Sequence, residues 1–349
     1  MVARQVWAGP DVDISGALSP DGGFLAYTDW STGDLAVQDL ATGEKRRLTN
    51  KGSWFESSEY ALFSALSSDS QQVAYGWLNK DEFFDLRVIG IDGSEPRVLY
   101  RDEELDYVVP VGWSPDGKQI LALFTRPDRS AQIVLVSVAD GSVRVLRSFD
   151  WRYQPALGAS LSPDGRYVAY SFPPREGSPE HDIVLLAVDG SSEIRLVEHP
   201  ANDFVLGWAP DGKRVLFASD RAGTSGAWVI QVADGQPRGV PELVKPDLTP
   251  IAAGWLGLTR DGSYYYGHFA WVNDVYVATL DPVTGTLQRP QKLVRHVGFD
   301  TSVEWSPDGG SLAYAWGLGY GQGPFVLGIR SLGAGQARRL RLGEITRFG

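Results

Sequence analysis

Short apolar runs separated by polar turns recur along the whole chain, and their spacing predicts strands instead of helices. Phe24–Tyr27, Ile120–Leu123 and Val168–Tyr170 are examples, and each is three or four residues long and follows a Gly-containing turn. Runs of this length bounded by Gly, Pro and Asp are typical of β-strands, whereas no segment keeps the 3.6-residue apolar period of a helix. We therefore expect an all-β protein.

A turn motif related to Ser-Pro-Asp-Gly recurs seven times and divides the chain into units of 47 to 50 residues. Pro at the second position fixes φ and Gly at the fourth completes a type I turn. The second copy reads Ser-Ser-Asp-Ser and the sixth reads Thr-Arg-Asp-Gly. The aspartates of the seven copies are Asp21, Asp69, Asp116, Asp164, Asp211, Asp261 and Asp308.

Each unit has room for four short strands. One precedes the turn, one follows it directly, a third ends at a second tight turn such as Asp189-Gly190, and a short fourth closes the unit. Four antiparallel strands in each repeat of this length are typical of a propeller blade. We predict an all-β fold, a seven-bladed β-propeller with four antiparallel strands per blade, in which residues 1–349 form a single domain.

The Pro-Asp-Gly repeat, present over essentially the whole chain, resembles the TolB-like family of seven-bladed β-propellers, whose hallmark is a WD-like repeat of this kind. The resemblance implies the fold. It says little about function, because the architecture serves binding, lyase, hydrolase and peptidase-gating roles alike. It also implies a bacterial protein of the periplasm or another extracytoplasmic site. The chain itself begins without a signal peptide, so a cytoplasmic location stays open.

Two segments compete for the last strand of the seventh blade. Arg4–Trp7 at the N-terminus and Ala337–Arg341 near the C-terminus both have the pattern of a fourth strand. The tail 344–349 resembles the lead-in to a further blade. We therefore weigh the alternative that the chain is part of a longer protein.

The charge and composition exclude several classes of function. The chain has 32 Lys and Arg against 43 Asp and Glu, a net charge of −11, which argues against nucleic acid as a partner. It has no Cys, which excludes disulfides, thiolate metal sites and cysteine nucleophiles. No run of 18 apolar residues is present, so we expect no membrane insertion. We expect a monomer.

Longer and more varied loops gather at one end of the predicted blades, and function is expected there. These loops join the second strand to the third and the fourth strand to the next first strand. All four His residues fall in them, either as exposed loop residues or as parts of a metal site or general base. These candidate catalytic residues are His181, His199, His268 and His296.

Carboxylates are predicted around the central channel, where the first strands converge. Asp13, Asp203 and Asp300 stand eight residues before a repeat aspartate. Glu304 stands four residues before Asp308 and is a further catalytic candidate. The three aspartates, with His199 and His296, are candidate ligands for a divalent metal such as Ca, Mg, Mn or Zn, although no cofactor is certain. Hydrogen bonding to channel water or backbone N–H groups is the alternative.

Aromatic and charged residues cluster in several of the same loops. Such clusters suit carbohydrate or peptide surfaces, and they suit packing between blades equally well. The candidate ligand-binding residues are Trp54, Glu56, Tyr60, Tyr107, Arg126, Trp151, Arg152 and Trp271.

No catalytic motif accompanies these clusters. The chain lacks a Gly-x-Ser-x-Gly elbow and a phosphate-binding glycine loop that opens a helix. The leading hypothesis is a recognition module that binds a peptide, protein or glycan at the long-loop face and channel mouth. One alternative is a metal-assisted hydrolase or polysaccharide lyase at the channel mouth, so whether the protein is an enzyme stays open. Another is a gating or sensor propeller from a larger protein.

Overall fold

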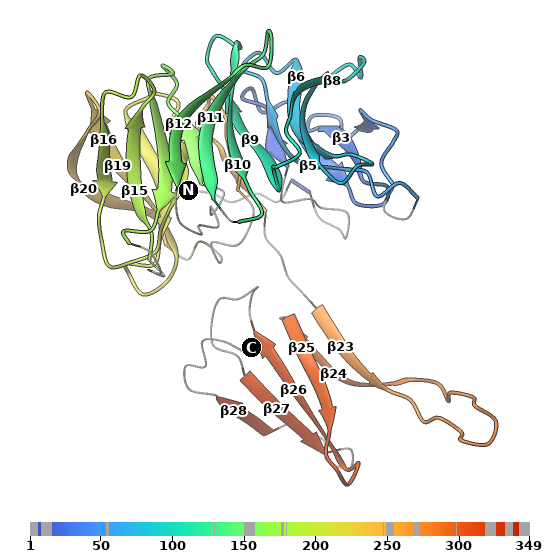
Figure 1. The fold of residues 1–349 in the computed structure, drawn as a ribbon. Coiled ribbons are helices and arrows are strands. Elements are labelled where there is room, and N and C mark those ends of the chain that lie inside the picture. The colour runs from blue at the N-terminus through green and yellow to red at the C-terminus, as the bar shows by residue number, and fades with distance from the viewer. Residues whose placement is uncertain are drawn as a thin grey trace. The chain divides into compact units, whose positions relative to one another are not determined.

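The computed structural model divides the chain into two compact units, Met1–Gly267 and His268–Gly349, which are described separately (Figure 1). No helix occurs among the described residues, and none of them forms a segment able to cross a membrane as a helix. The described residues are 6–7, 16–53, 56–128, 130–149, 158–175, 178, 180–246, 248, 255–267, 272–297, 299–317, 326–331 and 338–341.

Antiparallel four-stranded sheets repeat along the first unit, each built from four strands consecutive in the chain. The first sheet holds β1 (Ala17–Leu18), β2 (Phe24–Asp29), β3 (Asp34–Asp39) and β4 (Lys45–Arg47). The second holds β5 (Tyr60–Leu66), β6 (Gln72–Leu78), β7 (Phe84–Gly90) and β8 (Arg97–Arg101). The third holds β9 (Tyr107–Trp113), β10 (Gln119–Thr125), β11 (Ala131–Ser137) and β12 (Val143–Phe149).

The remaining sheets of this unit continue the pattern. The fourth holds β13 (Ala159–Leu161), β14 (Tyr167–Phe172), β15 (Asp182–Ala187) and β16 (Glu193–Val197). The fifth holds β17 (Asp203–Trp208), β18 (Arg214–Ser219), β19 (Gly226–Ala233) and β20 (Gln236–Lys245). The sixth repeat contributes a two-stranded sheet of β21 (Trp255–Leu258) and β22 (Tyr264–Tyr266).

The second unit is also made of antiparallel strands. Its two-stranded sheet holds β23 (Val272–Val277) and β24 (Gln291–Val297). Its four-stranded sheet holds β25 (Phe299–Trp305), β26 (Ser311–Gly317), β27 (Val326–Ser331) and β28 (Arg338–Arg341). β28 lies within the predicted fourth strand Ala337–Arg341. Of the alternative segment Arg4–Trp7, only residues 6–7 are described, and they lie outside any strand.

First strands lie on the inside of the first unit. β5 contacts β1 and β9, β13 contacts β9 and β17, and β21 contacts both β17 and β1. The turn before β22 reaches the first repeat as well, since Arg260 N–H donates to the Pro20 carbonyl at 2.8 Å. Successive sheets therefore surround a common centre, as the propeller prediction requires. The seventh repeat lies in the second unit, so the count of seven blades and the single domain remain predictions.

The repeated turn is held by its own side chains. In the first copy the Ser19 hydroxyl donates to Asp21 Oδ1 at 2.6 Å and accepts the Phe24 N–H at 2.8 Å. Asp21 Oδ1 also accepts the Gly23 N–H at 3.0 Å. Gly22 has a φ of 75°, a conformation that suits Gly. The second copy has Ser70 at that position, with a φ of 62°.

Apolar cores lie between neighbouring sheets. One buried cluster joins the first and second sheets around Tyr75 and Trp77, and another joins the second and third around Leu86 and Ile120. Burial of such side chains supplies roughly 25 cal/mol for each Å² of apolar surface removed from water. Each sheet is therefore stabilised mainly by the sheets beside it.

Arginine side chains add a second link between successive sheets. Arg46 on β4 donates to the Ile91 carbonyl at 2.5 Å, just beyond β7. Arg97 on β8 donates to Val138 O at 2.5 Å, and Arg144 on β12 donates to Val188 O at 2.6 Å. We call these three bonds the arginine latches. On β16 the corresponding residue is Ile194, which packs on the apolar cluster between the fourth and fifth sheets instead.

Candidate functional site

A buried carboxylate organises the loop end of the second sheet, where β7 begins. Asp85 lies directly opposite Arg101 of β8 in the antiparallel register. Arg87 follows two residues later on the same face of β7, because side chains alternate along a strand. Local strand geometry therefore brings two guanidinium groups to one aspartate.

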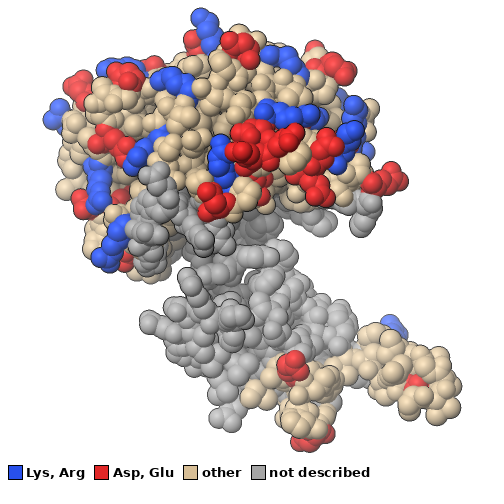
Figure 2. Space-filling model, in the orientation of Figure 1, with Lys and Arg blue, Asp and Glu red and all other residues tan. Residues whose placement is uncertain are grey.

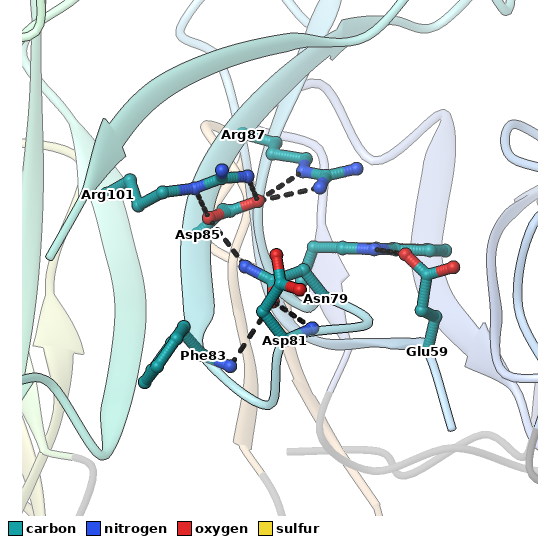
Figure 3. Close-up of polar contacts among 8 residues, drawn as sticks. Glu59, Asn79, Asp81, Phe83, Asp85, Arg87 and Arg101 are labelled. Carbon is teal, nitrogen blue, oxygen red and sulfur yellow. Dashed lines mark hydrogen bonds and ion pairs between the residues drawn. The ribbon is translucent and has the colours of Figure 1, made fainter. Parts of the chain in front are cut away.

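The contacts of Asp85 are short and charge-assisted (Figure 3). Arg101 Nε lies 2.7 Å from Oδ1, and Arg87 NH2 lies 2.6 Å from Oδ2. The Asn79 amide donates to Oδ1 at 3.0 Å. The Asp85 side chain is 0% exposed, and burial alone raises the pKa of its carboxyl; the hydrogen bonds from Arg101 and Arg87 outweigh burial and hold the pKa below its ordinary value. Asp85 is therefore a structural anion and has no role as a proton donor at neutral pH.

Asn79 extends this frame into the loop between β6 and β7. Its side-chain oxygen accepts the N–H of Asp81 at 2.9 Å and that of Phe83 at 3.3 Å. On the other side, Trp77 Nε1 donates to Glu59 Oε1 at 3.2 Å, and the Arg87 guanidinium lies 5.1 Å from the centre of the Trp77 ring. The loop and its neighbours are thus fixed by side-chain hydrogen bonds at the site shown in Figure 3.

Three aromatic rings lie beside this frame. Phe84, which precedes Asp85, is buried and contacts the Tyr60 ring edge-on, with ring centres 6.1 Å apart. The Tyr107 ring, at the start of β9, lies 5.1 Å from Phe84 on the other side and is 40% exposed. The second and third sheets therefore present one supported aromatic surface at their loop end, which we call the Tyr107 surface.

Charged side chains border the Tyr107 surface. Arg126 NH1 lies 3.0 Å from Glu104 Oε2, and Arg126 NH2 lies 3.7 Å from Asp102 Oδ2. Figure 2 shows Lys and Arg interspersed with Asp and Glu over the first unit. Exposed ion pairs of this kind add little stability and leave their charges accessible to a partner.

A second buried carboxylate lies at the loop end of the fifth sheet. Asp203, at the start of β17, is 0% exposed, and Arg221 NH2 donates to both of its oxygens at 2.9 and 2.8 Å. Burial raises the pKa of Asp203, and the hydrogen bonds of Ser219 and Arg221 offset only part of that effect. The Arg221 guanidinium lies over the rings of Phe217 and Trp228. The side chains of Arg221 and Asp203 thus hold each other within the folded structure.

Two of the four His residues border this second carboxylate. His181 Nδ1 lies 3.0 Å from Asn202 Oδ1, and the His181 carbonyl accepts the Asp203 N–H at 2.9 Å. The His199 backbone N–H donates to Asp182 Oδ1 at 3.4 Å, while its side chain is exposed. Burial also raises the pKa of Asp182, which Arg195 and that N–H offset only in part. The fourth and fifth sheets thus bring His181, His199, Asp182 and Asp203 to one loop end.

The structure gathers some of the residues singled out in the sequence. Tyr60 and Tyr107 share the aromatic surface, with Arg126 on β10's following loop in its border. Glu56 is exposed, and its backbone N–H donates to the Ser53 hydroxyl. Glu304 lies on β25 opposite Ala313, and its inward position at the channel stays a prediction.

Other candidates fall outside the described residues or side chains. His296 pairs with Asn273 in the β23–β24 register, and Asp300 pairs with Trp316 in the β25–β26 register, but only their backbones are described. Candidates outside the described residues altogether are Asp13, Trp54, Trp151, Arg152, His268 and Trp271.

The described part of the chain contains no set of ligands that supports the metal hypothesis. Within that part, no group of three or more His, Asp or Glu side chains is placed to hold a metal ion. Asp203 has both oxygens bound to Arg221, so its carboxylate is already neutralised by a cation of the protein. Divalent metal binding by Asp203 would require this ion pair to open.

Sequence reasoning missed the groups that fix the Tyr107 surface. Asn79, Arg87 and Arg101 were not singled out from the sequence. The available signal was an aspartate and an arginine two residues apart on a predicted strand, with another arginine at the end of the following strand. That pattern indicates a cross-strand charge cluster.

Comparison with known proteins agrees with this geometry. The family model described as TolB beta propeller domain matches residues 69–242. A solved structure from Agrobacterium tumefaciens, assigned to TolB, has a TM-score of 0.53 and 23% identity, and the match covers 69% of this chain and 83% of that chain.

Two curated proteins are also similar. An uncharacterised protein of Agrobacterium fabrum is 26% identical over 223 residues, which are 62% of this chain and 69% of that protein. A TolB homologue of Chlorobium chlorochromatii is 37% identical over 67 residues, 17% of this chain and 15% of that protein. With the repeated turn and the four-stranded sheets, these matches show that the chain belongs to the TolB-like β-propeller family.

Proposed function

We propose that this protein is a protein-binding module whose contact surface is the Tyr107 surface at the loop end of the second and third sheets. One observation carries the proposal: the Tyr107 ring is 40% exposed and is held against the buried Phe84 ring. Aromatic side chains on rigid supports contribute much of the affinity in protein interfaces, because little conformational entropy is lost when they bind.

The support beneath the ring strengthens this proposal. Asp85, Arg101 and Asn79 fix the start of β7, which carries Phe84, so the surface exists before a partner arrives. Charges at Arg126 and Glu104 provide the polar rim that interfaces commonly place around an aromatic centre. The partner class that fits is an extended or looped peptide segment of another protein.

The test is a selection of peptides from a random library on the purified protein, followed by affinity measurements on single variants. We expect the selected peptides to bind Tyr107→Ala at least tenfold more weakly than the unchanged protein, since truncation of a central aromatic contact typically costs over 1.4 kcal/mol. Arg126→Ala is expected to have a smaller effect, because Arg126 is half-buried and already paired with Glu104.

Leu243→Ala is the matched control, because Leu243 is 46% exposed but lies on β20 of the fifth sheet. Peptides that bind equally well to Tyr107→Ala and to the unchanged protein would contradict the proposed surface. Failure to select any peptide would contradict the protein-binding function itself.

The finer architecture belongs to the same proposal. Seven copies of the turn favour a closed propeller of seven blades formed by residues 1–349 as one domain. We propose that it acts as a monomer. Membership of the TolB-like family supports a location outside the cytoplasm, and scattering of the purified protein in solution tests closure and monomeric state together.

A further inference from the structure

A cleft of about 750 Å³ lies beside the first sheet, apart from the Tyr107 surface. The end of β2 and the turn after it form one wall, and the short edge strand β4 forms the other. Its volume falls in the range of small-molecule sites. The residues that line it are Tyr27, Asp29, Trp30, Ser31, Lys45, Arg46 and Arg47.

The lining is cationic in an acidic protein. Lys45, Arg46 and Arg47 form the only run of three consecutive Lys or Arg residues in a chain of net charge −11. Among the described residues that line the cleft, Asp29 is the single acid. Three positive charges against one negative charge favour an anionic ligand.

The three cations are held in place by neighbouring groups. Arg47 Nε lies 2.7 Å from Asp29 Oδ2, and Asp29 Oδ1 also accepts the Ser31 hydroxyl at 2.5 Å. Arg46 is fixed by its latch to the Ile91 carbonyl, and the Lys45 ammonium lies 4.4 Å from the centre of the Trp7 ring. Each guanidinium has five N–H donors, more than these bonds use, so donors remain for a ligand.

Aromatic rings give the cleft a second kind of contact. Trp30 is 48% exposed at the cleft, whereas Tyr27 is buried behind it and meets the Trp7 ring edge-on at 5.0 Å. Charged residues on an edge strand also discourage sheets from pairing edge to edge. That role requires neither a cleft nor a half-exposed indole, so it does not account for this arrangement.

We propose that this cleft binds a small carboxylate ligand that carries a ring with an apolar face. The carboxylate pairs with the guanidinium and ammonium groups of β4, where charge-assisted bonds are strongest. The ring packs on the exposed face of Trp30. Both a sugar acid and an aromatic acid have this chemistry.

Titration calorimetry with four probes tests the proposal. Glucuronate and 4-hydroxybenzoate carry a ring and a carboxylate, acetate carries only the carboxylate, and glucose carries only the ring. We expect at least one ring acid to bind about tenfold more tightly than acetate or glucose, and whichever binds identifies the ring type. Glucose or acetate binding as tightly as both ring acids, or no binding of either ring acid at millimolar concentration, would overturn the proposal.

Variants locate the site. Lys45→Gln and Arg46→Gln are each expected to weaken ring-acid binding about tenfold, because each removes one charge-assisted contact. Arg144→Gln is the matched control, since it removes an equivalent latch on β12 and should leave binding unchanged.

Trp30→Ala is expected to abolish the preference for a ring acid over acetate. Unaltered affinity in Lys45→Gln, Arg46→Gln and Trp30→Ala together would exclude this cleft as the site. Tyr107→Ala leaves the cleft intact, so failure here and failure of the proposed protein-binding function are separable.

Discussion

Aspartates at the turn end of the sheets behave alike, whereas those at the loop end each have their own partners. At the turn end, six repeat aspartates accept a hydroxyl two residues earlier in the chain: Ser19, Ser67, Ser114, Ser162, Thr259 and Ser306. Asp211 follows Ala209 and pairs with Arg214 instead. In all seven the pKa lies below the ordinary value of 3.8.

At the loop end, the pKa values of the buried aspartates are shifted in different directions. Burial raises the pKa of Asp85 as it does those of Asp182 and Asp203, but only Asp85 has enough donors to bring its pKa below the ordinary value. Asp85 receives two guanidinium groups and an amide, whereas Asp203 receives one guanidinium and the Ser219 hydroxyl. The balance between burial and the donors therefore decides the direction in which the pKa of each carboxyl is shifted.

The largest effect is expected from Asp85→Ala. This change leaves the buried ends of Arg87 and Arg101 without their anion and Asn79 without its acceptor, so we expect the free energy of unfolding to fall by about 3 kcal/mol. Urea denaturation measures it. Asp116→Ala at the turn end is the comparison variant. An equal loss in both variants would refute the distinction between the two ends.

Stability should depend on pH in opposite directions for Asp85 and Asp203. The folded pKa of Asp85 is lowered, so its contribution is present above pH 3.8 and is lost as pH falls through the folded pKa. The folded pKa of Asp203 is raised, so its contribution is present below pH 3.8 and is lost as pH rises through the folded pKa.

Unfolding free energies of Asp85→Asn and Asp203→Asn, each subtracted from that of the unchanged protein, measure these slopes. Between about pH 3 and pH 6 we expect the difference for Asp203→Asn to shrink with rising pH. Below about pH 4 we expect the difference for Asp85→Asn to shrink with falling pH. Slopes of the same sign for the two residues would show that the balance between burial and the donors does not set the pKa.

Removal of a turn hydroxyl should have a smaller effect. Ser114 Oγ donates to Asp116 and accepts the Gln119 N–H at 2.9 Å, so Ser114→Ala is expected to cost about 1 kcal/mol of unfolding free energy. Ala209→Ser adds the missing hydroxyl to the fifth copy and should stabilise the protein by a similar or smaller amount. Thermal and urea denaturation check both; destabilisation by Ala209→Ser would show that the fifth turn differs in more than its side chain.

The smallest expected effect concerns the second turn. Ser70 has a φ of 62° where the other six copies have Gly. Ser70→Gly relieves the left-handed strain and is expected to stabilise the protein by about 0.5–1 kcal/mol. Gly117→Ser in the third copy, where φ is 70°, is the reciprocal change and should destabilise it. Unchanged stability in both variants would show that the positive φ does not strain the backbone at Ser70.

The turn end could be predicted from the sequence because its contacts are local. Ser114 and Asp116 are two residues apart, so the repeat itself contains the interaction that holds each turn. The four-stranded units and the resemblance to TolB followed from that repeat.

The loop end could be predicted only in part. Tyr60 and Tyr107 were among the candidate ligand-binding residues, and both rings contact Phe84. Arg101 and Arg221 lie 16 and 18 residues from the aspartates they neutralise, and their pairing depends on register and loop path. Local patterns do not contain that information, so the frame beneath the Tyr107 surface was missed.

The arginine latches have a consequence for how the molecule opens. Each latch is a hydrogen bond from Arg46, Arg97 or Arg144 to a carbonyl of the next sheet. The outer strand of each of the first three sheets therefore opens only when the bond to the next sheet also breaks. Amide protons along that outer wall should then exchange with solvent as a cooperative block. The outer strand of the fourth sheet has apolar packing at Ile194 in place of this bond, so its amide protons should exchange independently of the fifth sheet.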